Sequence, residues 1–265
     1  MITMKGGMVF INTKTGKKVS QEELVETADS YDVIIFGEKH DSKDCHLAEL
    51  ALLKGLSGKY NIIFSMEMFE RDVQGVLDEY LMGKITEEEF LRKSRPWNNY
   101  KDDYRPQVEY CKTNNIPVLA SNVPRYIASK VAKNGPGVLK SLSLKERNFV
   151  ADTVFFENPE YRERFYNTMA HINMPGFTSS MRENYYKAQC LKDATMAESI
   201  IRALENKNGH KVFHINGSFH SDYHLGVVWQ ISKMAPQVKV LVIAPVEKGE
   251  KYDENIGDFV FYYEK

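Results

Sequence analysis

The chain has little cysteine, only three among its 265 residues, and these three are far apart. Cys45, Cys111 and Cys190 form no C-x-x-C pair. An odd number of distant cysteines excludes a disulfide framework, and the missing pair excludes a thiolate zinc knuckle. This cysteine usage fits a reducing compartment best.

The chain also lacks an excess of charge of one sign, and it lacks long hydrophobic runs. The 35 basic residues are balanced by 36 acidic ones, and the formal net charge is -1. Nucleic acids and anionic membranes are bound by a basic surface excess, so we expect neither as a partner. No run approaches the ~18 continuous apolar residues of a transmembrane segment.

The N-terminal stretch MITMKGGMVFINTKTG lacks the apolar core of a signal peptide, and no lipobox-like cysteine lies nearby. We therefore expect a cytoplasmic protein from the sequence as given. If a leader has been removed, we expect a cell-envelope lipoprotein instead.

The chain does contain a series of short apolar runs, at residues 31–38, 60–68, 116–122, 210–218 and 238–245. They are continuous rather than alternating, which is typical of strands buried on both faces. Helical patterns separate them, and this order predicts an α/β fold with a mostly parallel central sheet and helices on both faces. We also expect a small hairpin over 8–20 and an edge strand over 259–264.

Two stretches interrupt this alternation, at about 70–104 and about 135–188. Both have helical patterns, and neither contains a convincing strand. We predict a single domain over 1–265 in which the two insertions pack together as a helical cap beside the sheet. A long helix is expected over 181–206, with Gly209 suited to a left-handed turn after its end.

Polar side chains follow the predicted strands. Glu38 and His40 follow the first, Glu67 ends the second, and His220 follows the fourth. The carboxyl ends of parallel strands meet at one edge of the sheet, so these groups should converge. Two histidines with carboxylates are a common ligand set for Zn, Mn or Fe. We predict His40, Glu67 and His220 as ligands of such a metal, with Glu38 as an acid or base toward its bound water.

Other polar residues at the same edge are candidates for ligand binding. Asn122 and Arg125 follow the third strand and could hold a carboxylate or a phosphate. His224 follows His220 and is a further candidate. Each motif taken alone is weak, because a histidine after a strand is usually a hydrogen-bonded loop residue. His210 and His214 lie within a predicted strand, and we interpret them as structural.

Five motifs in this order carry a resemblance: VIIFGEKHDSKDCH, SMEMFERDVQ, YRPQVEYCKTNNIPVLASNVPR, YKAQCLKDATMAESI and HINGSFHSDYHLGV. Together they resemble the ChaN haem-binding uptake family of the Tiki and erythromycin-esterase superfamily, over about residues 16–245. The resemblance implies an α/β domain with a helical subdomain, a role in haem or iron uptake and handling, and haem held between two subunits by a tyrosine and a histidine. It therefore implies a possible homodimer.

The wider superfamily implies a different activity, metal-dependent hydrolysis, which would use Glu38, His40, Glu67 and His220. We expect haem as the cofactor and keep a divalent metal such as Zn, Mn or Fe as the alternative. The ligand would be haem or another small molecule.

A haem site needs apolar walls, an axial ligand and basic groups for the propionates. Residues 155–187 are rich in all three, although packing within a helical cap explains most of these side chains equally well. Two residues are our candidates for haem binding. His171 lies just before Pro175, which ends a helix, and Tyr104 lies where it could face the strand-end cleft.

Overall fold

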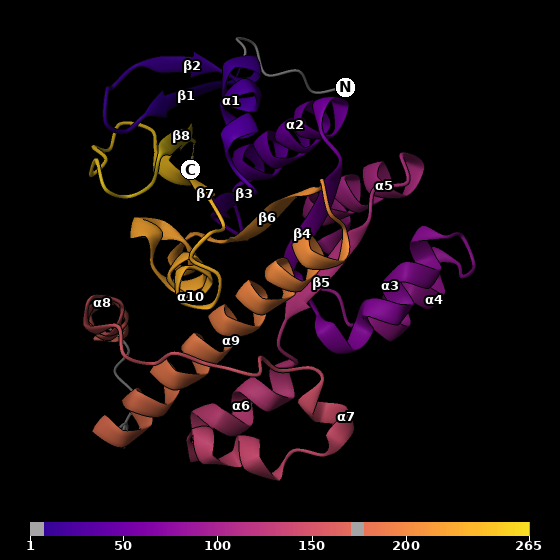
Figure 1. Ribbon diagram of the computed structural model, residues 1–265, viewed down its shortest axis with the longest axis vertical. Helices are drawn as coiled ribbons and strands as arrows, with labels where there is room; N and C mark the ends of the chain where they lie inside the picture. The colour runs from indigo at the N-terminus through magenta and orange to yellow at the C-terminus, as the bar shows by residue number, and fades with distance from the viewer. Residues whose placement is uncertain (1–7, 171–177, 265) are drawn as a thin grey trace.

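The protein is built around an eight-stranded sheet with the strand order β2-β1-β8-β7-β3-β6-β4-β5. The computed structural model describes residues 8–170 and 178–264 (Figure 1). The strands are β1 (Val9–Asn12), β2 (Lys18–Ser20), β3 (Val33–Glu38), β4 (Ile62–Glu70), β5 (Val118–Asn122), β6 (Lys211–Gly217), β7 (Val240–Glu247) and β8 (Phe259–Tyr263).

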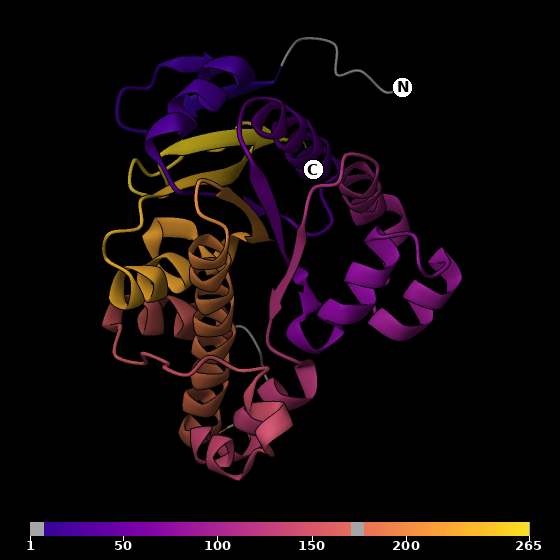
Figure 2. The same cartoon turned by 45° about the vertical axis from the view of Figure 1, so that its right-hand side comes forward.

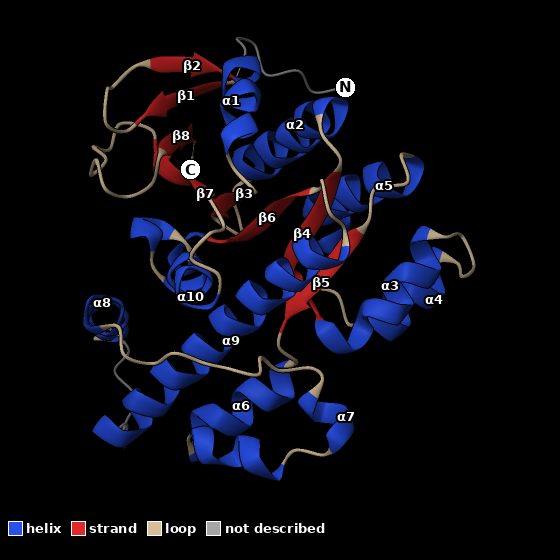
Figure 3. Cartoon of the chain, in the orientation of Figure 1, coloured by secondary structure: helices blue, strands red, loops and turns tan. Residues whose placement is uncertain are grey.

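The sheet is mostly parallel, as predicted. The strands from β8 to β5 all pair in parallel, whereas β1 is antiparallel to both β2 and β8. The expected N-terminal hairpin is present as β1 and β2. The prediction of an edge strand over 259–264 is wrong, because β1 pairs with the outer side of β8 and makes it an interior strand (Figure 3).

Helices cover both faces of the sheet, as predicted (Figures 1 and 2). They are α1 (Gln21–Thr27), α2 (Lys43–Lys59), α3 (Gln74–Leu81), α4 (Glu87–Ser94), α5 (Arg105–Thr113), α6 (Arg125–Asn134), α7 (Leu144–Arg147), α8 (Pro159–Met169), α9 (Ser179–Asn206) and α10 (Gly226–Met234). Side chains alternate along β3, so Ile34 and Phe36 pack on the α2 side while Val33 and Ile35 pack on the α9 and α10 side.

The two helical insertions do not pack together as one cap, which corrects that expectation. Side chains of α3 and α4, such as Leu77 and Phe90, join the large cluster with α2 and α5. The later insertion fills two other clusters against α9, around Val150 and around Tyr161. In Figures 1 and 2, α3 and α4 lie on one side of α9 and α8 lies on the other. The long helix α9 therefore lies between the first insertion and α8, whereas α7 of the later insertion lies on the same side of α9 as α3 and α4.

Several helices begin at residues that the sequence indicates as helix starts. Ser20 and Thr86 form the capping boxes that their sequences indicate, each with a glutamate three residues later. The helix expected over 181–206 is α9, which begins two residues earlier at Ser179. No helix within the described residues is long and apolar enough to cross a membrane.

Candidate functional site

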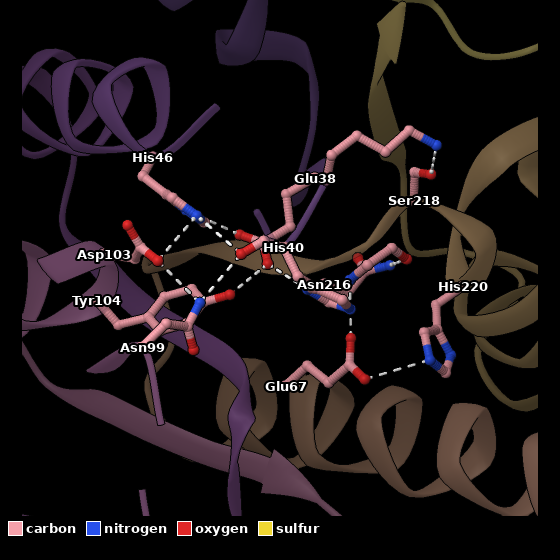
Figure 4. Close-up of polar contacts among 12 residues, drawn as sticks. Glu38, His40, His46, Glu67, Asn99, Asp103, Tyr104, Asn216, Ser218 and His220 are labelled. Carbon is pink, nitrogen blue, oxygen red and sulfur yellow. Dashed lines mark hydrogen bonds and ion pairs between the residues drawn. The ribbon is translucent and has the colours of Figure 1, made fainter. Parts of the chain in front are cut away.

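The predicted polar residues meet where three neighbouring parallel strands end. Glu38 is the last residue of β3, Glu67 lies near the end of β4, and β6 ends between them at Gly217. His220 follows in a short 3₁₀ turn, Ser218–His220. We call Glu38, His40, Glu67 and His220 the strand-end site, and Figure 4 shows them close together.

The two glutamates approach this edge from opposite faces of the sheet. Glu38 shares its side of β3 with Ile34 and Phe36, which pack into the cluster beneath α2. Glu67 shares its side of β4 with Ile63, which packs beneath α9. Successive side chains of a strand alternate between faces, so the pattern of each strand assigns its glutamate to one face. The strand-end site therefore has two halves.

The first half is centred on Glu38, a carboxylate that is 1% exposed. Its Oε1 lies 2.5 Å from His40 Nδ1 and accepts a hydrogen bond of 2.6 Å from the Tyr104 hydroxyl. Burial alone would raise the pKa of Glu38, but hydrogen bonds with His40 and His46 lower it to about 2. Glu38 is therefore a charged acceptor that orients the His40 ring, whose side chain is 44% exposed.

The second half is a chain of four buried groups. Glu67 Oε1 lies 3.2 Å from His220 Nε2, and His220 Nδ1 lies 2.5 Å from Asp193 Oδ1. The Tyr161 hydroxyl donates a 2.8 Å hydrogen bond to the other Asp193 oxygen. Burial would lower the pKa of His220, but the charges of Glu67 and Asp193 outweigh it and raise the pKa to about 10. His220 is therefore a cation held between two carboxylates.

Gly217 joins the two halves. Its backbone N–H donates a 2.8 Å hydrogen bond to Glu67 Oε2. The His40 ring lies against the same residue, since a Cβ on Gly217 would be only 2.6 Å from His40 Nε2 and 3.7 Å from Glu67 Oε2. Only glycine leaves room for this approach of the imidazole to the backbone.

A second polar cluster lies on the other side of Glu38. His46 Nδ1 is 3.3 Å from Glu38 Oε2 and 3.3 Å from Glu49 Oε2. Gln107 Nε2 lies 3.3 Å from the same Glu49 oxygen. We call Glu38, His46, Glu49 and Gln107 the inner cluster. Burial would lower the pKa of His46, but both carboxylates raise it to about 10, and burial with the charge of Glu38 raises the pKa of Glu49.

The family model described as "Haem-binding uptake, Tiki superfamily, ChaN" matches residues 24–231 of this chain. The chain belongs to the ChaN family. This confirms the resemblance that the five sequence motifs indicated.

Similar proteins agree on the ChaN fold. A solved structure of cofacial haem binding to ChaN of Campylobacter jejuni has a TM-score of 0.74 at 19% identity and covers 100% of both chains. An erythromycin esterase mutant in its open conformation has a TM-score of 0.54 at 12% identity, covering 97% of this chain and 82% of the esterase. At such identities the likeness shows the fold alone.

One relative among curated proteins is Protein RETICULATA-RELATED 5, chloroplastic, of Arabidopsis thaliana. It is 21% identical over 253 residues, which make up 87% of this chain and 34% of that protein. The ChaN chain thus spans about a third of the length of this relative.

The three predicted metal ligands of this ChaN protein lie near one another but do not form a compact ligand set. Among the described residues, one group of three ligand-type side chains has all its donor atoms within 4.8 Å of one another, and it is Glu38, His46 and Glu49. His220 instead forms an ion pair with Glu67, and His40 packs against Gly217. The arrangement at Glu67 therefore does not fit a metal held by these three residues.

The predicted ligand-binding residues are placed apart from the strand-end site or have other contacts. Asn122 donates to the backbone oxygen of Glu67 at 3.1 Å and so supports the end of β4. Arg125 is the first residue of α6 and lines a separate cavity of about 580 Å³ with Arg95. His224 lies 3.1 Å from Asp258.

The two predicted haem ligands also differ in placement. Tyr104 is fully buried, and its hydroxyl is engaged with Glu38. Burial and the charge of Glu38 raise the pKa of Tyr104, which disfavours the phenolate that would bind iron. His171 lies outside the described residues.

Five residues of these polar clusters were missed or not assigned to the site from the sequence: Asp193, His46, Glu49, Gln107 and Tyr161. Asp193 occupies the buried face of α9, where a lone carboxylate among apolar neighbours is a signal that a partner is present. His46 and Glu49 are three positions apart on the buried face of α2, so the helix period could have paired them. Tyr161 gives no comparable signal.

His214 supplies a prediction about acid stability. Burial lowers its pKa from 6.5 to about 3, and its Nδ1 is 2.8 Å from Ser65 Oγ. The unfolded chain binds this proton below pH 6.5 and the folded chain does not, so the free energy of unfolding should fall as pH drops from 6.5 toward 3, by up to ~1.4 kcal/mol per pH unit.

Urea unfolding of the wild type and of His214→Asn at pH 6.5 and pH 4.5 measures this effect. The wild type should lose more stability than the variant over the interval. Asp222, whose pKa burial raises to about 6, titrates in both proteins and cancels in the comparison. Equal losses in the two proteins would contradict a neutral, buried His214.

Proposed function

We propose that this protein binds haem and takes part in haem or iron handling. The observation that carries the proposal is membership of the ChaN family over residues 24–231, combined with a full-length likeness in fold to the ChaN protein whose structure records cofacial haem binding. A cofacial arrangement stacks planar haems, so we further propose that haem is shared between two copies of this chain.

We propose that haem binds along α8 and the start of α9, and we call Arg162, Tyr166, Met181 and Arg182 the α8–α9 surface. Arg182 lies 5.4 Å from the centre of the Tyr166 ring, and Arg162 forms a 3.4 Å ion pair with Glu183. Met181 is 39% exposed. This surface offers apolar contact and guanidinium groups for propionates. His171, which follows α8 in the sequence, remains the predicted axial ligand.

The interior of the same segment serves packing. Tyr161, Phe165 and Tyr186 are buried together in one aromatic cluster, and the rings of Phe165 and Tyr186 are 5.8 Å apart. Helical packing thus accounts for these side chains, and the haem proposal depends on the α8–α9 surface, where Met181 is exposed and the other three residues are half-buried.

A haemin titration followed by visible absorption tests the proposal. We expect a saturable, stoichiometric shift for the wild type and an altered absorption band for His171→Ala. Met181→Ser should weaken binding roughly tenfold, because burying a methionine side chain is worth ~1.5–3 kcal/mol. Met82→Ser is the matched control, since Met82 is exposed directly after the end of α3, and α3 lies on the opposite side of α9 from α8 (Figure 1).

Light scattering on the same samples measures the mass of the complex. A mass that doubles when haem is added supports sharing between two chains. No saturable shift in the wild type would refute haem binding, and equal affinities of the Met181 and Met82 variants would place haem elsewhere.

Hydrolysis is the second candidate function, and the geometry of the strand-end site favours it. His40 is oriented by Glu38 and is exposed to solvent, an arrangement suited to a general base that takes a proton from water. The cationic His220 lies nearby and could stabilise an oxyanion formed at an ester or amide carbonyl. This scheme needs no step through a metal at Glu67.

The double variant His40→Ala with His220→Ala separates the two functions. If the strand-end site hydrolyses esters, the pair should lose activity by ~100-fold or more while haem affinity stays close to the wild-type value. A panel of ester and amide substrates measures the rate, and the haemin titration measures affinity. Collapse of haem affinity in an inactive protein would eliminate the hydrolase.

A further inference from the structure

The inner cluster has features of a cation site, and of its four residues only Glu38 has a part in the proposed function. It is assembled from three elements, with Glu38 from the end of β3, His46 and Glu49 from α2, and Gln107 from α5. All four side chains are buried, and none is more than 4% exposed. The cluster is separate from His40 and Glu67, which lie on the other side of Glu38.

One carboxylate oxygen of the inner cluster, Glu49 Oε1, has no hydrogen-bond partner among the described residues, and Glu38 Oε2 lies 3.3 Å from His46 Nδ1 in an ion pair. Buried carboxylate oxygens are normally hydrogen-bonded, paired or bound to a metal, because leaving them bare costs several kcal/mol or more. A bare, buried oxygen of Glu49 beside a second buried carboxylate indicates that a further positively charged partner belongs in this cluster.

The position of His46 supports the same interpretation. Its Nε2 lies 3.3 Å from the backbone oxygen of His40, so a proton on Nε2 is used in a hydrogen bond. Nδ1 then faces both glutamates, each 3.3 Å away, and a proton on Nδ1 links the imidazole to the two carboxylates. A divalent cation bound between these three groups would take the place of that proton, because a metal binds the neutral imidazole. A histidine with one nitrogen bonded to a carbonyl is the usual arrangement of a metal ligand.

Charge balance favours a divalent ion. Two carboxylates and a neutral imidazole around a doubly charged cation sum to zero, which removes the cost of burying the two negative charges. The three donors lie within 4.8 Å of one another, close enough to share one ion. A flip of the Gln107 side-chain amide would exchange its oxygen and nitrogen. The oxygen would then lie beside Glu49, where Nε2 lies now, and could serve as a fourth ligand.

We propose that Glu38, His46 and Glu49 bind one divalent cation in the interior of the protein, with Gln107 as a further oxygen ligand. Imidazole with carboxylates suits Zn²⁺, Mn²⁺ or Fe²⁺, and the absence of a thiolate from this ligand set argues against a soft ion. The cation would fix Glu38, which in turn orients His40 and Tyr104. The proposal is independent of haem binding.

Metal binding to the full-length protein tests this site. The protein is stripped with EDTA and titrated calorimetrically with Zn²⁺ and with Mn²⁺, and the metal content of protein grown in supplemented medium is measured. We expect one tight site per chain. Glu49→Gln should weaken binding by more than the ~10–100-fold that loss of an outer-shell partner typically costs.

Glu67→Gln is the matched control, because it makes the same change at the other buried glutamate of this edge. It should retain the cation. The proposal is overturned if the wild type shows no saturable binding, if Glu67→Gln loses the ion while Glu49→Gln keeps it, or if both lose it equally. Should Glu49→Gln fail to fold, His46→Gln replaces it in the same comparison.

Discussion

Replacing Asp193 by alanine should lower the free energy of unfolding by ~3–5 kcal/mol, the usual cost of removing one partner from a buried ion pair. Asp193 is fully buried and contacts His220 at 2.5 Å and the Tyr161 hydroxyl at 2.8 Å. Without it, a cationic imidazole and a phenol would be left in the interior with fewer partners. The ring of His220 would also lose the contact that orients it toward Glu67.

Chemical unfolding at pH 7 measures this effect, and two milder variants provide the controls. Asp193→Asn keeps one acceptor for His220 and should cost less than the alanine variant. Tyr161→Phe removes a single hydrogen bond and should cost about 0.5–1.5 kcal/mol. If Asp193→Ala were no more destabilised than Tyr161→Phe, His220 would not be a buried cation in the folded protein.

Replacing Gly226 by alanine should destabilise the protein to a similar extent. Gly226 begins α10 with a φ of 51°, and a Cβ there would lie 2.3 Å from the backbone oxygen of His220. A left-handed conformation costs a non-glycine residue ~1–3 kcal/mol, and overpacking adds a comparable amount. Since the clash is with backbone, relief would require movement of the turn that carries His220.

The matched control for this variant is Gly58→Ala. Gly58 lies in α2, and nothing is within 4 Å of the position that its Cβ would take. The change should therefore stabilise the protein by about 0.5–1 kcal/mol through helix propensity. Thermal melting compares the two variants with the wild type. A melting temperature of Gly226→Ala equal to that of Gly58→Ala would contradict the close approach to His220.

Much of the fold could be predicted because local rules decide it. Continuous apolar runs such as residues 33–38 indicate strands buried on both faces, and their carboxyl ends in a parallel sheet must share an edge. Two predictions about the fold were wrong because they depend on contacts between segments far apart in the sequence. The pairing of β8 with both β1 and β7 depends on where the N-terminal hairpin returns. The placement of α8 away from α3 and α4 depends on the path of α9 between them.

The residues of the candidate site also divide into those that the local sequence identifies and those that it does not. Glu38 and His40 could be found because they follow a strand directly, and Glu67 and His220 because they end or follow other strands of the same sheet. Asp193 comes from the middle of a helix, 27 positions from His220, and nothing in its local sequence identifies that partner. The sequence therefore predicted which side chains lie at the ends of the strands. It did not predict which side chains from the helices contact them.

The two oxygens of Glu38 face different neighbours, Oε1 toward His40 and Tyr104 and Oε2 toward His46. The carboxylate of Glu38 therefore takes part in two sets of contacts, one through each oxygen, and its negative charge is shared between them. A positive group that binds Oε2 should weaken the hydrogen bond between Oε1 and His40. By thermodynamic reciprocity, a stronger bond between Oε1 and His40 should weaken binding at Oε2 by the same free energy. Glu38 therefore makes the buried interior and the solvent-facing edge of this protein energetically linked, with a short side chain as the coupling element.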